Sequence, residues 1–529
     1  MSTEKEKLAR SAGGVSLATT GSRVFGLVRE QVFAYLFGAG LATDAFVAAF
    51  RIPNLLRDLF AEGAMSAAFV PAFSKKLSLE GKQNAFFLFN LVGNVLLVIL
   101  AGVVVLGIFF TPAIVSAIAP GFGKIAGKAE LTAYLARIMF PFLILVALAA
   151  LTMGVLNSFG HFAWPAFSPS FLNIAMIAAG FLICPLFEQP IVGMAYGVLL
   201  GGFLQWAVQL PLLRKEGYCY QPVFSFRHPE LFTIVSLVLP TLIGIASTQV
   251  NIFVNTQIAS LLPEGAVSYL NYAFRLMHFP LGVFGVALAT VSLPALSQKV
   301  AAQDRKGVAG VANSAMGLVF FLNLPASLFL IVFAGPIVSV LYQHGRFGST
   351  DTLHTASALK FYAIGLLGYS GVRVLAPVFY AFADTKTPVK VGILSVFSNI
   401  VLNLSFYKLG FSFQWLAFSA SVSAFVNFFV LFFLFKKKLP EWEAGPVMEK
   451  FFRIFLSTLP PTFVCWGGLS YLAGLAVHSS LGTRVILLAA FSVLFAGLYL
   501  LCARILKVPE EKLVVGLLKK IVWKAQTAA

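Results

Sequence analysis

Long runs of apolar residues, separated by short polar segments, cover almost the whole chain. About 20 consecutive apolar residues are enough to cross the hydrocarbon core of a bilayer as an α-helix. The pattern therefore predicts an all-α polytopic membrane protein with fourteen membrane-spanning helices and no room for a soluble domain. The predicted spans are residues 14–37, 42–72, 85–110, 131–155, 165–184, 191–213, 231–262, 266–296, 312–341, 356–381, 389–407, 412–435, 453–475 and 484–505.

After the last span the pattern changes. Residues 506–529 alternate apolar and basic positions at helical spacing, as in KVPEEKLVVGLLKKIVWKAQ. Such a segment is typical of an amphipathic helix that lies on a membrane surface. The sequence thus predicts a cytoplasmic amphipathic tail.

Composition agrees with the membrane interpretation, because 59% of the residues are hydrophobic and 11% are charged. A soluble domain has about 25% charged residues. The net charge of +18 would suggest nucleic acid in a soluble protein, but here most basic residues lie in short loops, where they determine topology. We therefore expect no nucleic-acid partner.

The distribution of Lys and Arg predicts both termini on the cytoplasmic side. With that orientation, inner segments hold 24 basic residues, whereas outer loops hold five. No apolar segment with a small-residue cleavage site follows the charged N-terminus, so we expect no removable signal peptide. The five outer-loop residues are Lys124, Lys128, Arg346, Lys408 and Arg484.

The chain contains an internal repeat at an offset of 223 residues. Pro71, Phe159 and Pro165 recur as Pro294, Phe382 and Pro388, and the AFR motif at 49–51 recurs at 273–275 with an offset of 224. Each copy has six spans, so the copies share one orientation across the membrane. The predicted organisation is a six-helix half (1–213), a second six-helix half (231–435) and two additional helices (453–505). Two parallel halves of this kind are typical of transporters.

The first two spans are unusually rich in charge. Residues 22–76 carry Arg23, Arg29 and Arg57 together with several acids, although a charge at the bilayer centre costs at least about 2.5–3.5 kcal/mol. We predict that these arginines face a water-filled cavity and bind an anion, since the guanidinium group suits phosphate. The alternative is that some of them lie at helix ends and reach lipid phosphates.

Helical geometry separates these charges. Arg51 and Arg57 are six residues apart and so lie about 120° apart around a helix. Asp44 is a candidate partner for an arginine of the first span. Asp58 and Glu62 form an i, i+4 acidic pair that suits salt bridges or gating.

Several chemistries are excluded because their motifs are absent. The sequence has no GxGxxG motif that opens a helix, no GxxxxGKS and no HExxH. The four cysteines have no metal-binding spacing, and the six histidines are scattered. We expect no catalytic residues, no metal site and no cofactor.

The motifs SRVFGLVRE, ATDAFVAAFRIPNLLRDLFAEGAMSAAFVP, NYAFRLMHFPLGVFGVALATVSLPALS and APVFYAFADTKTPVK resemble those of the MurJ (MviN) family. These are lipid II flippases of the MOP exporter superfamily, and the resemblance covers nearly the whole chain. It implies transport of lipid II, the undecaprenyl-pyrophosphate-linked peptidoglycan precursor, from the inner to the outer leaflet of the bacterial inner membrane. Membrane lipids and cell-wall synthesis or division proteins are the other partners it suggests.

The resemblance also implies roles for individual residues. Substrate contacts fall on Arg23, Arg29, Arg57, Arg275, Asn54 and Ser268, and gating or salt-bridge roles fall on Asp44 and Glu62. The last two spans would form a groove for the polyprenyl tail. Arg275 matches Arg51 in the repeat, so Arg51 is expected to be structural and the cavity asymmetric.

One departure concerns ions. Some members of the family bind sodium through carboxylates of the seventh and eleventh spans. The polar residues in those spans here are uncharged, which places a sodium site in doubt; they are Gln249, Asn251, Asn255, Asn399 and Asn403.

We expect transport by alternating access, with the membrane potential or an ion gradient as the candidate energy source. Moving one charge across a membrane potential of 100 mV changes its free energy by about 2.3 kcal/mol. A diphosphate with two negative charges would therefore gain ~4–5 kcal/mol per 100 mV when it leaves a negative cytoplasm. One alternative function is the export of another undecaprenyl-pyrophosphate-linked oligosaccharide. A second is the export of cationic drugs, for which the predicted cavity is too basic. A third is a non-transporting scaffold for cell-wall enzymes.

Overall fold

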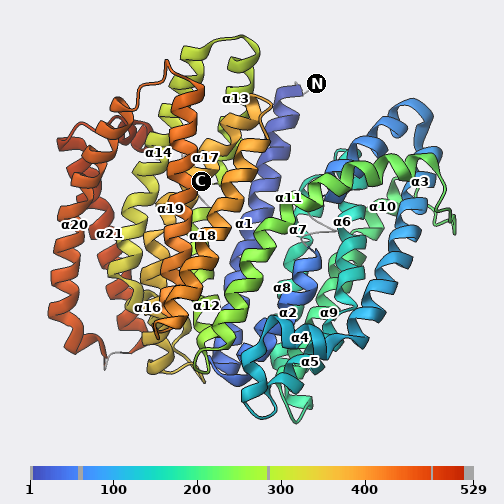
Figure 1. Ribbon diagram of the computed structural model, residues 1–529, viewed down its shortest axis with the longest axis horizontal. Helices are drawn as coiled ribbons and strands as arrows, with labels where there is room; N and C mark the ends of the chain where they lie inside the picture. Colours follow the sequence, from blue (N-terminus) through green and yellow to red (C-terminus); the bar gives the residue numbers. More distant parts are fainter. Residues whose placement is uncertain (1–3, 58–63, 283–285, 478–479, 517–529) are drawn as a thin grey trace, which may run out of the picture. The chain divides into compact units, whose positions relative to one another are not determined.

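A computed structural model describes residues 4–57, 64–282, 286–477 and 480–516 (Figure 1). Within these ranges the secondary structure is helical and contains no strand. Nine helical stretches among the described residues are long and apolar enough to cross a membrane. The predicted all-α, multi-pass class is confirmed, while the number of fourteen spans stays a prediction.

The chain folds into two compact units. The first comprises residues 1–268 and 344–348, and the second comprises residues 269–343 and 349–529. The helix that contains Ala266–Pro280 therefore begins in the first unit and continues in the second. The predicted limits of the six-helix halves and of the tail groove stay predictions.

The first unit is built from eleven α-helices and two short 3-10 helices within the described ranges. They are α1 (Glu4–Phe37), α2 (Leu41–Arg57), α3 (Ala64–Phe109), α4 (Thr111–Ile118), η2 (Pro120–Lys124), α5 (Lys128–Met139), α6 (Phe142–Ser158), α7 (Ala163–Phe167), α8 (Pro169–Leu182), η3 (Cys184–Leu186), α9 (Ile191–Ala207), α10 (Leu210–Lys215) and α11 (Pro229–Ser260).

Several predicted spans are interrupted in the first unit. The span expected at 131–155 is α5 followed by α6, because the chain turns at Phe140 and Pro141. Within the loop predicted between the second and third spans, α3 is broken into two helical segments at Gly81. Gly81 has φ 85° and ψ 177°, a conformation that favours glycine because it has no Cβ. The connection between the two helical segments is thus a tight one at a glycine.

The second unit continues α12 and adds nine helices within the described ranges. They are α12 (Ala266–Pro280), α13 (Val286–Ala301), α14 (Arg305–Val332), α15 (Ala334–Tyr342), α16 (Ser349–Ile364), α17 (Leu366–Ala381), α18 (Lys386–Lys408), α19 (Gln414–Lys438), α20 (Gly445–Val477) and α21 (Leu481–Ile505).

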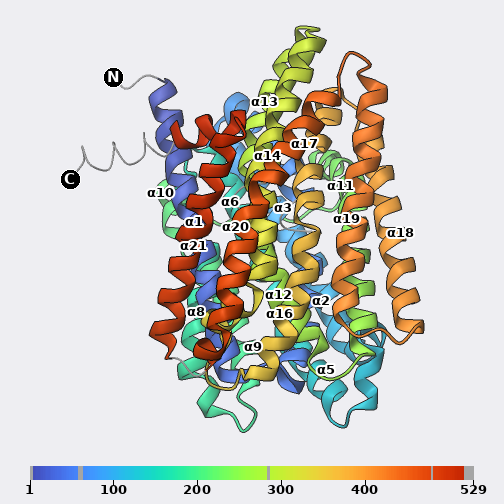
Figure 2. The same cartoon turned by 90° about the vertical axis from the view of Figure 1, so that its left-hand side faces the viewer.

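The peripheral helices of the second unit expose much of their surface. In the most apolar stretches of α18 and α21, 17% and 11% of the residues are buried, against 61% in α14. Helix α21 lies beside α20, as Figures 1 and 2 show. Apolar exposure on this scale fits contact with lipid, because lipid tails solvate apolar side chains.

The predicted amphipathic tail is described only in its first part. Residues 509–516 are helical, and residues 517–529 lie outside the described residues. Glu510 is buried, and its carboxylate pairs with Lys450 of α20 at 2.9 Å. This ion pair fixes the start of the tail to the second unit.

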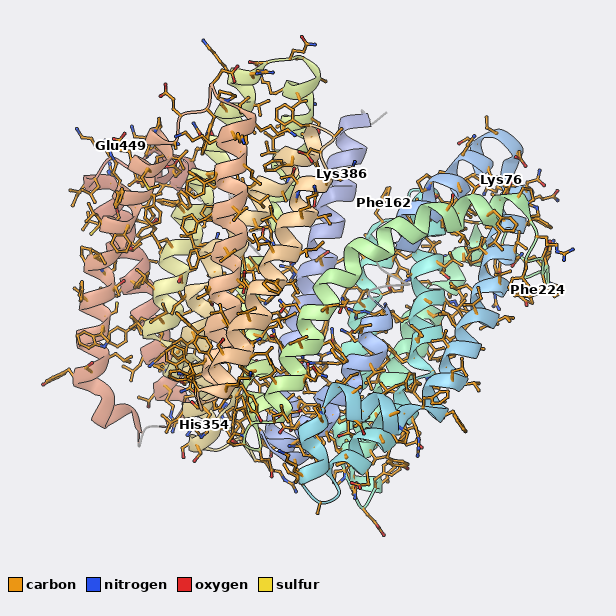
Figure 3. The ribbon with its side chains drawn as sticks, in the orientation of Figure 1. Lys76, Phe162, Phe224, His354, Lys386 and Glu449 are labelled. Carbon is orange, nitrogen blue, oxygen red and sulfur yellow. The ribbon has the colours of Figure 1, made fainter. Side chains whose placement is uncertain are left out.

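Some charged side chains lie near helix ends and kinks in both units. Figure 3 labels Lys76 before the kink of α3, Lys386 at the start of α18 and Glu449 in the first part of α20. Lys438 of α19 lies 2.6 Å from Asp384, which precedes α18. Lys438 and the Thr387 backbone N–H hold the pKa of Asp384 at about 2, below its usual value.

Candidate functional site

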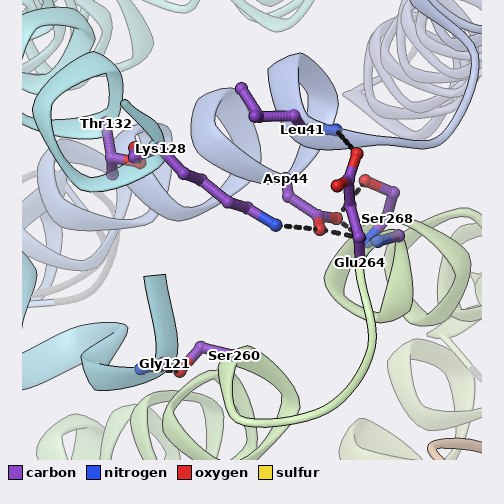
Figure 4. Close-up of polar contacts among 9 residues, drawn as sticks. Leu41, Asp44, Gly121, Lys128, Thr132, Ser260, Glu264 and Ser268 are labelled. Atoms are coloured by element: carbon purple, nitrogen blue, oxygen red, sulfur yellow. Dashed lines mark hydrogen bonds and ion pairs between the residues drawn. The ribbon is translucent and has the colours of Figure 1, made fainter. Parts of the chain in front are cut away.

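The most completely bonded polar group that we find in the first unit is the Asp44 carboxylate in the first turn of α2 (Figure 4). Asp44 is 1% exposed. One oxygen, Oδ2, accepts hydrogen bonds from Lys128 Nζ and from the Gly265 N–H, both at 2.8 Å. The other, Oδ1, accepts from the Ser268 N–H at 2.8 Å and from the Ser268 hydroxyl. A buried carboxylate with four donors is both neutralised and fixed in orientation.

The cation beside Asp44 differs from the predicted one. The expected pairing of Asp44 with a first-span arginine is wrong, because Lys128 supplies the charge. The sequence predicts an exposed outer loop for Lys128, but this residue begins α5, is 1% exposed, and has its ammonium 4.4 Å from the centre of the Phe122 ring. The sequence did not predict this ion pair, because Lys128 lies just outside an apolar run. The fold shows that its partner is Asp44.

Two helix starts cap each other at this cluster. The Glu264 carboxylate accepts the N–H of Leu41, the first residue of α2, at 2.8 Å. In return, Asp44 of α2 accepts the N–H groups of Gly265 and Ser268 at the start of α12. The first N–H groups of a helix have no partner inside the helix, so side-chain acceptors stabilise them. Leu41 and Glu264 are 223 residues apart, the offset of the sequence repeat.

A close backbone approach lies next to this cluster. The Gly121 N–H donates to the Ser260 hydroxyl at 3.2 Å (Figure 4). A Cβ at residue 121 would meet the Ser260 carbonyl oxygen at 2.0 Å. Only glycine allows η2 and the end of α11 to pack this closely.

Ser268 binds Asp44 in the structure, a contact that the sequence did not predict. The sequence resemblance gave it a substrate contact, but in this structure its side chain is fully buried and bonded to Asp44. The substrate role therefore stays a prediction, and the observed role is to bind the carboxylate.

The arginines of α1 differ in their surroundings. Arg23 is half-buried. Arg29 is 8% exposed and forms an ion pair with Glu30, the next residue, which is also buried. Burial of two charges is costly, and the ion pair with Glu30 offsets part of that cost. Both arginines belong to the first unit, and their predicted substrate contacts stay predictions.

The second helix carries two arginines in different settings. Arg51 donates to the Ile252 carbonyl at 3.2 Å and to the Thr256 hydroxyl, both on α11, which favours the structural role predicted for it. Arg57 ends α2 and is half-buried, as is Asn54 one turn earlier. The predicted gating acids Asp58 and Glu62 lie outside the described residues.

Arg275 is the predicted substrate contact of the second unit. It lies on α12 and is exposed, while Tyr272 and Leu276 of the same helix are buried. Exposure of a guanidinium on an otherwise apolar helix is compatible with an anion-binding role, because the cation keeps access to water and solute.

The polar residues of the eleventh predicted span form a neutral network with α19. Asn399, Asn403 and Ser419 are fully buried. The Asn403 amide N–H donates to Asn399 Oδ1 at 2.8 Å, and the Ser419 hydroxyl donates to Asn403 Oδ1. Asn399 Nδ2 is buried and has no hydrogen-bond partner among the described residues.

This network contains no carboxylate, and the doubt about a sodium site stays a prediction. Its side chains carry no negative charge, and the oxygen of Asn399 already accepts an N–H from Asn403. A cation buried in an apolar interior requires a compensating anion, and an unpaired N–H group repels it. The polar residues of the seventh span belong to the first unit.

Comparison with known proteins places the chain in one family. The family model described as lipid II flippase MurJ matches residues 33–502. A probable lipid II flippase MurJ from Vibrio cholerae is 40% identical over 81% of this chain and 83% of its own length. The lipid II flippase MurJ from Burkholderia cenocepacia is 36% identical over 93% of this chain and 96% of its own length.

Solved structures agree with this placement. A lipid II flippase MurJ in an inward closed conformation has a TM-score of 0.78 and 28% identity, and covers 93% of this chain and 98% of its own. An inward-facing MATE multidrug transporter of the MOP superfamily has a TM-score of 0.66 and 16% identity, over 80% of this chain and 95% of its own. The second similarity shows a common fold.

Proposed function

Because this chain belongs to the MurJ lipid II flippase family, we propose that it transports lipid II from the inner to the outer leaflet of the cytoplasmic membrane by alternating access. It acts as a transporter without chemical catalysis. The lysine and arginine distribution supports cytoplasmic N- and C-termini in the bacterial inner membrane.

The observation that carries this proposal is the set of arginines on the first two helices. Arg23, Arg29 and Arg57 are all at least half-buried. Guanidinium groups bind phosphate oxygens in pairs, and a pyrophosphate offers several such oxygens. The head group of lipid II enters the cavity and binds these arginines and Arg275.

Asp44 controls the outer side of the cavity in this proposal. Its bonds to Gly265 and Ser268 hold the start of α12 against α2. Release on the outer side requires this contact to open. The polyprenyl tail stays in lipid along α20 and α21, whose exposed apolar side chains include Phe463, Trp466 and Val493.

The proposed energy source is the membrane potential, without sodium. A diphosphate with about two negative charges gains ~4–5 kcal/mol per 100 mV when it leaves a negative cytoplasm. The neutral Asn399–Asn403–Ser419 network supports transport that does not depend on sodium.

Reconstitution tests the proposal directly. Purified protein in proteoliposomes should move lipid II between leaflets faster than protein-free vesicles. The same assay with a different undecaprenyl-pyrophosphate-linked oligosaccharide measures substrate choice. Equal transport of both lipids would favour the broader oligosaccharide flippase, and absence of lipid II transport by correctly folded protein would contradict the proposal.

A further inference from the structure

We propose that Lys128 is a positioning residue that allows Asp44 to release the start of α12 without leaving an unpaired carboxylate inside the protein. This inference rests on the proposed alternating access. It assigns a role to a buried lysine that the distribution of charges along the sequence places in an exposed loop.

Lys128 and Asp44 are held together by elements of the same unit. Helices α2 and α5 pack against each other, and their side chains meet at 2.8 Å with exposures of 1–2%. The Thr132 hydroxyl donates to the Lys128 carbonyl at 2.7 Å (Figure 4). The Phe122 ring lies beside the ammonium, with its centre at 4.4 Å. The lysine is thus fixed to α5 and approaches Asp44 from the side away from α12.

The donors of Asp44 fall into two groups. Three of its four hydrogen bonds come from the start of α12, through Gly265 and Ser268. The fourth comes from Lys128. When α12 withdraws, Asp44 keeps only the lysine, and the remaining pair is neutral overall.

The neutral pair matters for the energetics of opening. An ionised carboxylate without a partner is strongly disfavoured in an apolar interior, whereas a paired carboxylate is tolerated. With Lys128, the opened state contains an ion pair. Without Lys128, the opened state contains a lone carboxylate, so the three bonds to α12 become harder to break.

A purely structural role for Lys128 predicts the opposite change. If the lysine only stabilised the local packing, its removal would loosen the start of α12. If it lowers the cost of release, its removal keeps the start of α12 bound to Asp44. Hydrogen exchange separates the two roles, because the Ser268 N–H lies in the first turn of α12 and depends on Asp44 for protection.

The experiment compares four variants with the wild type in proteoliposomes and by hydrogen exchange of the peptide that covers residues 262–270. They are Lys128→Met, Lys128→Arg, the double variant Lys128→Met with Asp44→Asn, and Lys124→Met as a matched control. Lys124 is exposed and lies four residues earlier.

For Lys128→Met we expect a lipid II transport rate lower by about tenfold or more, with exchange at Gly265 and Ser268 no faster than in the wild type. Lys128→Arg keeps the charge and should retain most transport. The double variant has no lone charge and should transport faster than Lys128→Met. Lys124→Met should match the wild type.

Three results would overturn the inference: faster exchange in Lys128→Met, wild-type transport by that variant, or a double variant as slow as the single one. If Lys128→Met fails to fold, Lys128→Arg and the double variant still test the role of charge. Failure of the wild type to transport lipid II would contradict the proposed function instead, and the exchange comparison would still test Lys128.

Discussion

The Glu264 carboxylate lies 2.8 Å from the N–H of Leu41, a residue 223 positions earlier, and caps the start of α2. Loss of such a cap costs about 1 kcal/mol. We therefore expect Glu264→Ala to lower the Tm of the purified protein, while Glu264→Gln, which keeps an acceptor oxygen, has a smaller effect. Glu188→Ala removes another exposed acid and serves as the control. An unchanged Tm in Glu264→Ala would show that the bond contributes nothing to stability.

Removal of the proposed substrate-binding arginines should abolish transport. We expect Arg29→Ala and Arg275→Ala each to lose lipid II transport in proteoliposomes while still inserting into the membrane, because charge-assisted bonds to pyrophosphate are lost. Arg214→Ala, which removes an exposed arginine at the end of α10, should transport like the wild type. Wild-type rates in both substituted proteins would contradict the cavity assignment.

The ion pair between Asp384 and Lys438 predicts a dependence of stability on pH. The pKa of Asp384 is lowered to about 2 in the folded protein, mainly by Lys438, from an ordinary value of 3.8. The pair therefore stabilises the fold fully above about pH 4, and this contribution is lost as the pH falls towards 2.

At neutral pH we expect Asp384→Asn to lower the free energy of unfolding by about 1 kcal/mol or less, since the pair is partly exposed. The difference from the wild type should shrink between pH 4 and pH 2, as measured by chemical unfolding at each pH. Lys437→Met changes a neighbouring exposed lysine and should leave the pH dependence unaltered. A difference that is constant over this range would contradict the assignment.

The neutral network of α18 and α19 predicts that sodium does not stabilise the wild-type protein. Replacing potassium by sodium should leave its Tm and transport rate unchanged. Asn403→Asp adds a carboxylate beside Asn399 and Ser419. The Tm of this variant should therefore increase with sodium concentration, because a bound ion stabilises the folded state. The control is Asn427→Asp, at a polar position elsewhere on α19. A saturable sodium effect in the wild type would contradict the prediction.

A membrane potential should accelerate transport. With the interior of the vesicle made negative by a potassium gradient and valinomycin, outward movement of lipid II should be faster than without a potential, because the head group carries negative charge. The lipid-only vesicles under the same gradient provide the control. Rates that do not respond to the imposed potential would exclude this energy source.

The membrane class and the approximate positions of the helices could be predicted from the sequence. Apolar runs require burial in lipid or protein, and their length sets the spans, so this information is local. The basic residues of short loops predicted topology for the same reason. Motifs such as ATDAF and PNLL were specific enough to indicate the family.

Which charged side chains form pairs could not be predicted from the sequence and follows from the fold. Asp44 pairs with Lys128 and Ser268, which are 84 and 224 residues away, and hydrophobic periodicity contains no information about such distant partners. The same holds for Lys128 itself, which the sequence places in a loop and the fold buries. Electrostatic pairing depends on distances of a few ångströms between helices, and these distances are set by the packing of the whole unit.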